Sequence, residues 1–208
     1  MPQNLARRPA YWDEAKITLA QADPVLGGIM AHYHGTEGLT NRGNAFETLV
    51  RAVVGQQISV KAADSVWGKL SGAVEIAPPA LMAATVEQLR GCGLSGQKVK
   101  YIQGIAAAFA EEKIHPAKWQ SWDDAAIMAE LIGLPGIGRW TAEMFVMFHL
   151  LRPNVLPLAD LGLVKAFEMH YQQPRTALAA HAERYWQPYC TVATWYLWRS
   201  LDPVPVAY

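Results

Sequence analysis

Apolar residues recur with the spacing of an α-helix along most of this chain of 208 residues. The clearest stripe lies between Asn44 and Gln56, where apolar positions follow i, i+3, i+4, i+7 and i+8, as on the buried side of a helix. It consists of Phe46, Leu49, Val50, Val53 and Val54. Runs that alternate with period two are nearly absent, and the one extended-looking segment, 154–158, contains Pro157. The pattern predicts an all-α fold of roughly ten or more helices.

Residues that commonly cap helix N-termini precede several of these segments. Thr85 and Gln88 have the spacing of a capping box. The predicted caps are Asp23, Asn44, Ser59, Thr85, Ser95 and Ser121. Segment 91–98 has two glycines at phosphate-loop spacing, but no strand precedes it and Lys98 stands one place late. We therefore interpret this segment as a turn.

The composition supports a core without cross-links, since 51% of the residues are hydrophobic and 17% are charged. A chain of this length buries about 70% of its unfolded surface, which excludes disorder and a small disulfide scaffold. Two cysteines, Cys92 and Cys190, are too few for a thiolate-bound zinc or a four-cysteine iron–sulfur cluster. Neither a signal peptide nor a membrane span is predicted. We expect an intracellular protein, of the cytoplasm or nucleoid if bacterial, with no membrane partner.

Two places mark candidate domain boundaries, the loop over 35–43 and the helix stop at Arg152-Pro153-Asn154. They predict a central helical bundle over 41–153. Both chain ends, 1–40 and 154–208, are then expected to form a second helical subdomain, leaving a cleft between the two.

The segment from Leu134 to Ala142 predicts a tight turn between two helices. Pro135 fixes one φ, Gly136 and Gly138 permit positive φ and close backbone approach, and Ile137 can fill the gap between the helices. Amides at the start of the following helix face outward at the positive end of the helix dipole, which suits one backbone phosphate. A Gly-x-Gly turn is equally typical of a plain connection between two helices.

This turn, with hairpin residues 134–141, resembles the helix-hairpin-helix of DNA repair glycosylases. Downstream, 157–167 is similar to the Gly/Pro-rich loop and aspartate of the helix-hairpin-helix–GPD superfamily, and upstream 53–59 is similar to its alkylpurine branch. The resemblance extends into the aromatic runs 185–189 and 193–198 and covers most of the chain. It implies a compact, all-helical protein in which two helical subdomains flank a DNA-binding cleft.

The resemblance implies a base excision repair enzyme. It would flip an alkylated purine, of the 3-methyladenine or 7-methylguanine type, out of double-stranded DNA and hydrolyse the N-glycosidic bond, leaving an abasic site. Asp160 matches the catalytic aspartate, whose carboxylate can stabilise an oxocarbenium-like sugar and activate water. An aspartate before a helix is also a common N-cap. A non-catalytic helix-hairpin-helix module that only binds DNA is the alternative function.

Trp140 decides the expected reaction subtype. Lyase-active members of the superfamily carry a lysine at the matching position, and tryptophan cannot form a Schiff base, so a monofunctional glycosylase is implied. Trp140 and Trp198 match positions that line the base pocket, where an aromatic face suits cationic methylated purines. Met144 stands where the resembled enzymes have an aromatic residue. Most tryptophans of a helical protein are core residues, which is our expectation for Trp67, Trp186 and Trp195.

The remaining expectations concern DNA contacts and partners. Gln57 matches the side chain that enters the gap in the base stack, although the family has an apolar residue there and a plain helix-end glutamine is equally consistent. Further contacts are expected from Ser59, Leu134, Gly136, Ile137, Gly138, Arg139 and Thr141. No cofactor is implied, and it stays open whether the hairpin carbonyls hold a monovalent cation. With 18 basic and 18 acidic residues, we expect a monomer that binds DNA through a local site rather than a broad basic surface.

Overall fold

The computed structural model describes residues 8–33, 38–39, 41 and 43–201. Within these residues all regular structure is helical, with twelve α-helices and two short 3₁₀ helices. The predicted all-α fold is therefore confirmed. Residues 35–37, 40 and 42 of the predicted boundary loop lie outside the described residues.

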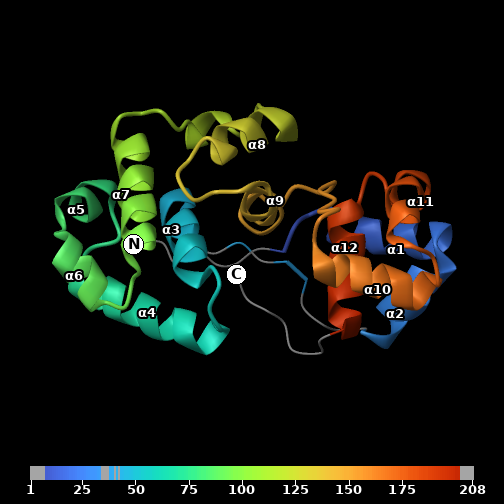
Figure 1. Cartoon of the computed structure of the whole chain (residues 1–208). Coiled ribbons are helices and arrows are strands. Elements are labelled where there is room, and N and C mark those ends of the chain that lie inside the picture. Colours follow the sequence, from blue (N-terminus) through green and yellow to red (C-terminus); the bar gives the residue numbers. More distant parts are fainter. Residues whose placement is uncertain (1–7, 34–37, 40, 42, 202–208) are drawn as a thin grey trace. The chain divides into compact units, whose positions relative to one another are not determined.

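The chain divides into two compact units (Figure 1). The central unit is Arg42–Phe145, and the terminal unit combines Met1–Asn41 with Val146–Tyr208. The second division falls inside helix α9 (Arg139–Phe148), whereas the sequence predicts a boundary after residue 153. In Figure 1 the terminal unit joins blue helices from the start of the chain to orange and red helices from its end.

The central unit is organised around the long helix α7. The helices of this unit are α3 (Ala45–Gly55), α4 (Val60–Ala73), α5 (Pro78–Ala83), α6 (Val86–Gly91), α7 (Gly96–Ala110), η1 (Pro116–Lys118), α8 (Asp124–Ile132) and the first part of α9. Helix α7 packs against α3, α5 and α6. The predicted apolar stripe of α3 is buried, and its first member, Phe46, meets Phe109 edge-on with ring centroids 5.2 Å apart. Each fully buried side chain of this size contributes about 1.5–3 kcal/mol to folding.

Most of the predicted helix caps are confirmed. Side-chain oxygens accept a hydrogen bond from the backbone of the first turn at Asp23, Asn44, Ser59, Thr85 and Ser95. The prediction for Ser121 is wrong, because helix α8 begins two residues later and Asp123 caps it with a 2.7 Å bond from the Ala126 amide. The Ser121 hydroxyl donates instead to the Lys118 carbonyl.

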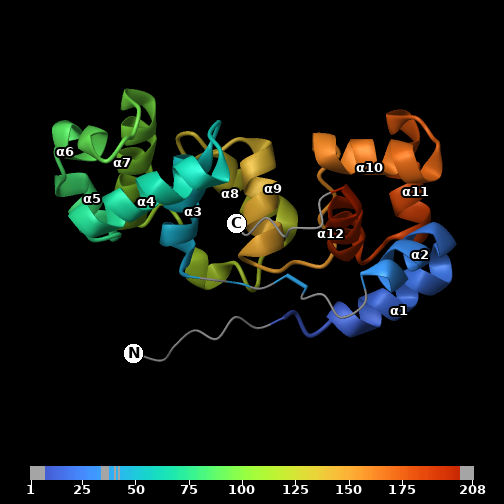
Figure 2. The same cartoon turned by 90° about the horizontal axis from the view of Figure 1, so that it is seen from below.

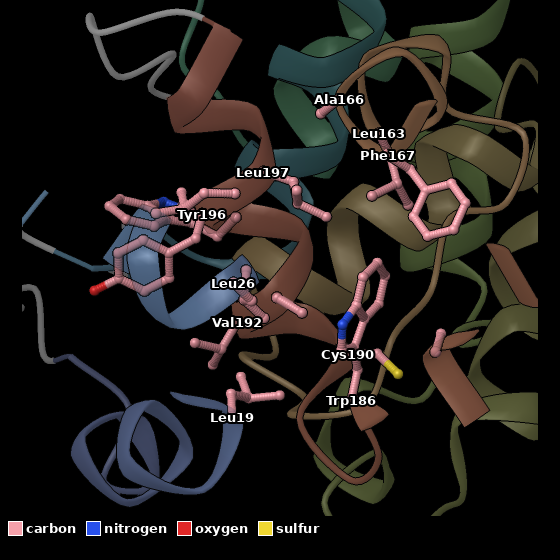
Figure 3. Close-up of a cluster of buried hydrophobic side chains, with 14 of the residues drawn as sticks. Leu19, Leu26, Leu163, Ala166, Phe167, Trp186, Cys190, Val192, Tyr196 and Leu197 are labelled. Atoms are coloured by element: carbon pink, nitrogen blue, oxygen red, sulfur yellow. The ribbon is translucent and has the colours of Figure 1, made fainter. Parts of the chain in front are cut away.

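The terminal unit has helix α12 at its core (Figure 2). Its helices are α1 (Trp12–Ala22), α2 (Pro24–His32), α10 (Leu161–Tyr171), η2 (Arg175–Ala177), α11 (Leu178–Tyr185) and α12 (Cys190–Leu201). Helix α12 packs against α1, α2 and α10. Leu19, Leu26, Phe167, Val192 and Leu197 from these helices all belong to one buried cluster (Figure 3).

The tryptophans differ in burial. Trp186 and Trp195 are core residues, as predicted. Trp67 is only half-buried, with the Arg51 guanidinium 5.4 Å from its ring centroid, so the core prediction is wrong there. Among the described residues, none of the helices combines the length and apolar character that crossing a membrane requires.

Candidate functional site

The predicted hairpin connects α8 to α9. The Ile137 amide donates to the Leu134 carbonyl over 3.2 Å, and the first bond of α9 runs from the Ala142 amide to the Gly138 carbonyl over 3.0 Å. Leu134 and Ile137 are 5% and 3% exposed, so both side chains fill the interior of the turn. Their predicted DNA contacts are therefore restricted to backbone atoms.

The hairpin packs against α7. Gly136 has φ +77°, and a Cβ there would collide with the Tyr101 ring, so the position needs glycine for two independent reasons. From the other side, a Cβ at Gly104 would lie 2.7 Å from Pro135 Cγ. Two residues of α7 therefore hold the turn in close contact.

The first turn of α9 presents the predicted phosphate-binding groups. The bond from the Ala142 amide to the Gly138 carbonyl marks the start of α9, and amides in the first turn of a helix form the arrangement that binds anions at helix N-termini. Gly138 and Arg139 are exposed, whereas Thr141 is 8% exposed and can offer little beyond its backbone. Arg139 donates through Nε to Glu143 Oε1 over 3.0 Å, and its side chain is 77% exposed. The guanidinium is thus oriented by a buried carboxylate while facing solvent.

The turn between α3 and α4 carries two other predicted DNA residues. Gln57 is exposed and has φ +59°, a backbone conformation that few residues other than glycine adopt. Ser59 is also exposed, and its hydroxyl caps α4 by accepting from the Ala62 amide over 3.3 Å. The preceding residue, Gln56, donates through Nε2 to the Gly136 carbonyl over 2.9 Å, so this turn is bonded to the hairpin.

Asp160 is the N-cap of α10 in the terminal unit. Its Oδ1 accepts from the Leu163 amide over 2.7 Å and from the Trp198 indole Nε1 over 2.8 Å. Asp160 is half-buried, and its neighbours Leu158 and Leu161 are 41% and 76% exposed. The carboxylate is thus fixed by two donors at a helix start that is open to solvent.

Trp198 is held in turn by its own surroundings. Its ring stacks on Phe148 with centroids 6.0 Å apart and an interplanar angle of 7°. At Gly162, an added Cβ would lie 3.1 Å from Asp160 Oδ1 and 3.2 Å from Trp198 Cδ1. The lack of a side chain at Gly162 therefore lets the indole reach the carboxylate.

The two remaining predicted pocket residues differ from each other. Trp140 is 39% exposed on α9, whereas Met144, one turn later, is only 5% exposed. Both precede Val146 and belong to the central unit, whereas Asp160 and Trp198 belong to the terminal unit. The structure brings Asp160 and Trp198 together and brings Gln56 to the hairpin. The base pocket of Trp140, Met144 and Trp198 stays a prediction.

Several site residues had no readable signal in the sequence. Phe148 and Gly162 act through Trp198, and Gln56 acts through Gly136, which lies 80 residues further along the chain. Lys98 lies in a segment that the sequence predicts only as a turn, yet its ammonium donates to the carbonyls of Val54 and Gln56. The Arg139–Glu143 pair, in contrast, has the i, i+4 spacing that a sequence reveals.

Comparison with known proteins identifies a family. Residues 50–188 match the model of the HhH-GPD superfamily base excision DNA repair proteins. DNA-3-methyladenine glycosylase 1 of Schizosaccharomyces pombe is 29% identical over 164 residues, which are 74% of this chain and 72% of that protein. A Bacillus subtilis protein, YfjP, with a provisional DNA-3-methyladenine glycosylase name is 34% identical over 128 residues. The match spans 60% of this chain but only 45% of that relative's length.

Solved structures give the same result. The DNA-3-methyladenine glycosidase of Bacillus halodurans superposes with a TM-score of 0.81 at 30% identity, covering 90% of this chain and 89% of that one. The S. pombe 3-methyladenine DNA glycosylase in complex with abasic DNA gives a TM-score of 0.75 at 26% identity, covering 90% and 96%. The family match, the hairpin and the capped aspartate agree, and this chain belongs to the HhH-GPD superfamily of base excision DNA repair proteins.

Proposed function

We propose that this protein is a monofunctional DNA glycosylase that hydrolyses the N-glycosidic bond of alkylated purines in double-stranded DNA. The substrate bases are of the 3-methyladenine or 7-methylguanine type, and the product is an abasic site. The protein acts as a monomer and turns the damaged nucleotide out of the base stack before cleavage. Its relatives and structural neighbours with 3-methyladenine glycosylase names support this substrate class.

The observation that carries the proposal is the geometry of Asp160. Its Oδ1 is fixed by the Leu163 amide and the Trp198 indole at an open helix start, so the carboxylate is oriented before substrate arrives. Cleavage of an N-glycosidic bond develops positive charge on the sugar, and a preorganised carboxylate beside it lowers the barrier. The same group can orient or deprotonate the attacking water, so the chemistry needs no organic cofactor.

DNA binding is assigned to the hairpin. Outward-facing amides at the start of α9, together with the exposed guanidinium of Arg139, suit one backbone phosphate. A contact of this kind positions the duplex and carries no sequence information. This fits an enzyme that must find damage in any sequence.

Water is the proposed nucleophile because the hairpin position that carries a lysine in lyase-active relatives is Trp140. An indole cannot form the imine that a lyase needs. Lys165 lies on helix α10, five residues after Asp160, so its side chain leaves the helix on a different face. Borohydride trapping on a damaged duplex is accordingly expected to yield no covalent protein–DNA adduct.

The test is base release. The purified protein is incubated with a methylated duplex and with the same duplex unmethylated, and free 3-methyladenine and 7-methylguanine are measured by chromatography. We expect release from the methylated duplex only, with alkali-labile abasic sites appearing in equal amount. Binding of the methylated duplex without release would instead support a non-catalytic helix-hairpin-helix module.

A further inference from the structure

The turn between α3 and α4 holds a strained residue in an exposed place. Gln57 has φ +59° and is exposed, and the next residue, Ile58, is 40% exposed. A left-handed backbone at a residue other than glycine is energetically unfavourable and persists only where the surroundings fix it. Such residues are concentrated at sites that bind ligands.

Lys98 fixes this turn from the side of α7. Its Nζ donates to the Val54 carbonyl over 2.7 Å and to the Gln56 carbonyl over 2.8 Å. Val54 and Gln56 lie at the C-terminal end of α3, where carbonyls lack helix partners and attract a cation. The ammonium is half-buried, and burial lowers the pKa of Lys98. The partly desolvated ammonium of Lys98 therefore fixes Gln56, the residue immediately before Gln57.

Gln56 extends the connection to the hairpin. While its backbone carbonyl accepts from Lys98, its side-chain Nε2 donates to the Gly136 carbonyl over 2.9 Å. Gly136 is the hairpin glycine that is pressed against Tyr101 of α7. Helix α7 thus contacts the hairpin directly and binds the α3–α4 turn through Lys98. Gln56 connects that turn to the hairpin.

We propose that Gln56 and Lys98 are positioning residues that hold the exposed Gln57 at a fixed spacing from the hairpin, so that one duplex engages both. This inference rests on the proposed DNA glycosylase function. We call the two residues and the Gly136 carbonyl the brace. Neither side chain needs to touch DNA, because each acts through the backbone that presents Gln57 and the hairpin amides.

The central unit contains a matched control for Gln56. Gln103 of α7 also donates through its side-chain Nε2 to a backbone carbonyl, that of Ala84, over 3.0 Å. Gln56→Met and Gln103→Met each replace a bonded amide by an apolar chain of similar length, and each loses one hydrogen bond to a carbonyl. Comparable changes in melting temperature are expected, so a difference in DNA binding would not arise from stability.

Binding is measured on a duplex that contains an abasic-site analogue. We expect Gln56→Met to weaken binding about fivefold to tenfold, the equivalent of one lost positioning bond, and Gln103→Met to change it less than about twofold. Lys98→Met is expected to act in the same direction as Gln56→Met. Equal affinities for the wild type and Gln56→Met would overturn the proposal.

A double-mutant cycle with Gln57→Ala separates positioning from general damage. If the brace acts by presenting Gln57, the loss caused by Gln56→Met shrinks to about twofold once the Gln57 side chain is absent. An undiminished loss in the Gln57→Ala background would contradict the proposal.

Hydrogen exchange of the free protein tests the brace without DNA. Gln56→Met is expected to raise the exchange rates of amides in both 55–59 and 134–139 about tenfold, and Gln103→Met to leave them unchanged. Failure of the wild type to bind or cleave damaged DNA would overturn the proposed function, whereas unchanged exchange would overturn the brace itself.

Discussion

The terminal unit contains two aspartates that cap helices in the same way and differ in their exposure to solvent. Asp23 caps α2 by accepting from the Leu26 amide over 3.0 Å, and Asp160 caps α10 by accepting from the Leu163 amide over 2.7 Å. Each also accepts from a tryptophan indole, Trp186 or Trp198, over 2.8 Å.

Their surroundings separate them. Asp23 is 3% exposed, and its Oδ2 also accepts from the Tyr171 hydroxyl over 2.6 Å and His181 Nε2 over 3.0 Å. Asp160 is half-buried at an open helix start. A carboxylate enclosed by four donors stabilises the fold, whereas one that is oriented by hydrogen bonds and also reached by solvent is suited to meet a substrate. The cap motif by itself therefore does not distinguish a structural aspartate from a catalytic one.

Substitution of Asp160 should affect catalysis more than any other change. Asp160→Asn keeps an acceptor for the Leu163 amide but removes the charge, so base release is expected to fall about a thousandfold while affinity for an abasic-site duplex is retained. Asp23→Asn, the matched variant, is expected to keep the wild-type rate per folded molecule. Single-turnover base release measures both, and full activity in Asp160→Asn would remove the proposed role.

For the free energy of unfolding, Asp23 is expected to matter more than Asp160. Asp23→Ala leaves three side-chain donors, one buried and two part-buried, without their acceptor and is expected to lower the free energy of unfolding by about 3–5 kcal/mol. Asp160→Ala removes a more exposed cap and is expected to cost about 1 kcal/mol. Urea unfolding followed by circular dichroism measures the two values. Equal losses would show that burial does not distinguish these caps.

The indole donors provide a finer comparison. Trp198→Phe retains an aromatic ring to stack on Phe148 but loses the donor to Asp160, so the rate of base release is expected to fall about tenfold with a stability loss under about 1 kcal/mol. Trp186→Phe is expected to cost about 1–3 kcal/mol of stability and leave the rate unchanged. A Trp198→Phe variant with the wild-type rate would show that the indole N–H does not position Asp160.

The smallest expected effect is on acid unfolding. Burial by itself raises the pKa of Asp23, but its hydrogen bonds from Tyr171, His181, Trp186 and the Leu26 amide outweigh burial and leave the pKa below its ordinary 3.8. The resulting stabilisation is present above pH 3.8 and is lost as the pH falls toward the folded-state pKa. Asp23→Asn is therefore expected to flatten the fall of the urea midpoint below pH 3.8.

His149 provides the internal control for that measurement. Burial lowers its pKa from 6.5 to about 4, so the unfolded chain binds the proton first and stability falls as the pH drops from 6.5 to about 4. Asp23→Asn is expected to leave this upper window unchanged. If Asp23→Asn changed the slope of stability against pH above pH 4 rather than below it, the effect would not come from the Asp23 carboxyl.

Local patterns predicted much of the fold. The α3 stripe and the caps at Asp23, Ser59, Ser95 and Asp160 are interactions within about one helical turn, so their spacing is visible in the chain. The error at Ser121 is of the same local kind, because Asp123 offered a better-placed acceptor two residues later.

The candidate site was predictable only in part. The hairpin glycines and Asp160 stand in a motif, and Gly136 proved to need its glycine for a φ of +77°. The burial of Met144 and Thr141 was not predicted, since it depends on neighbours far away in the chain.

Local sequence patterns suffice to predict that this chain is helical, that a Gly-x-Gly hairpin joins two of its helices, and that Asp23 and Asp160 each begin a helix. The packing of the helices decides which of these aspartates is enclosed and which is accessible. It likewise decides that the Trp198 indole reaches Asp160 across 38 residues and that Gln56 reaches the hairpin across 80. Capping and periodicity depend on neighbours along the helix, so they can be read from the sequence. Burial and hydrogen bonds between distant residues depend on how the helices pack.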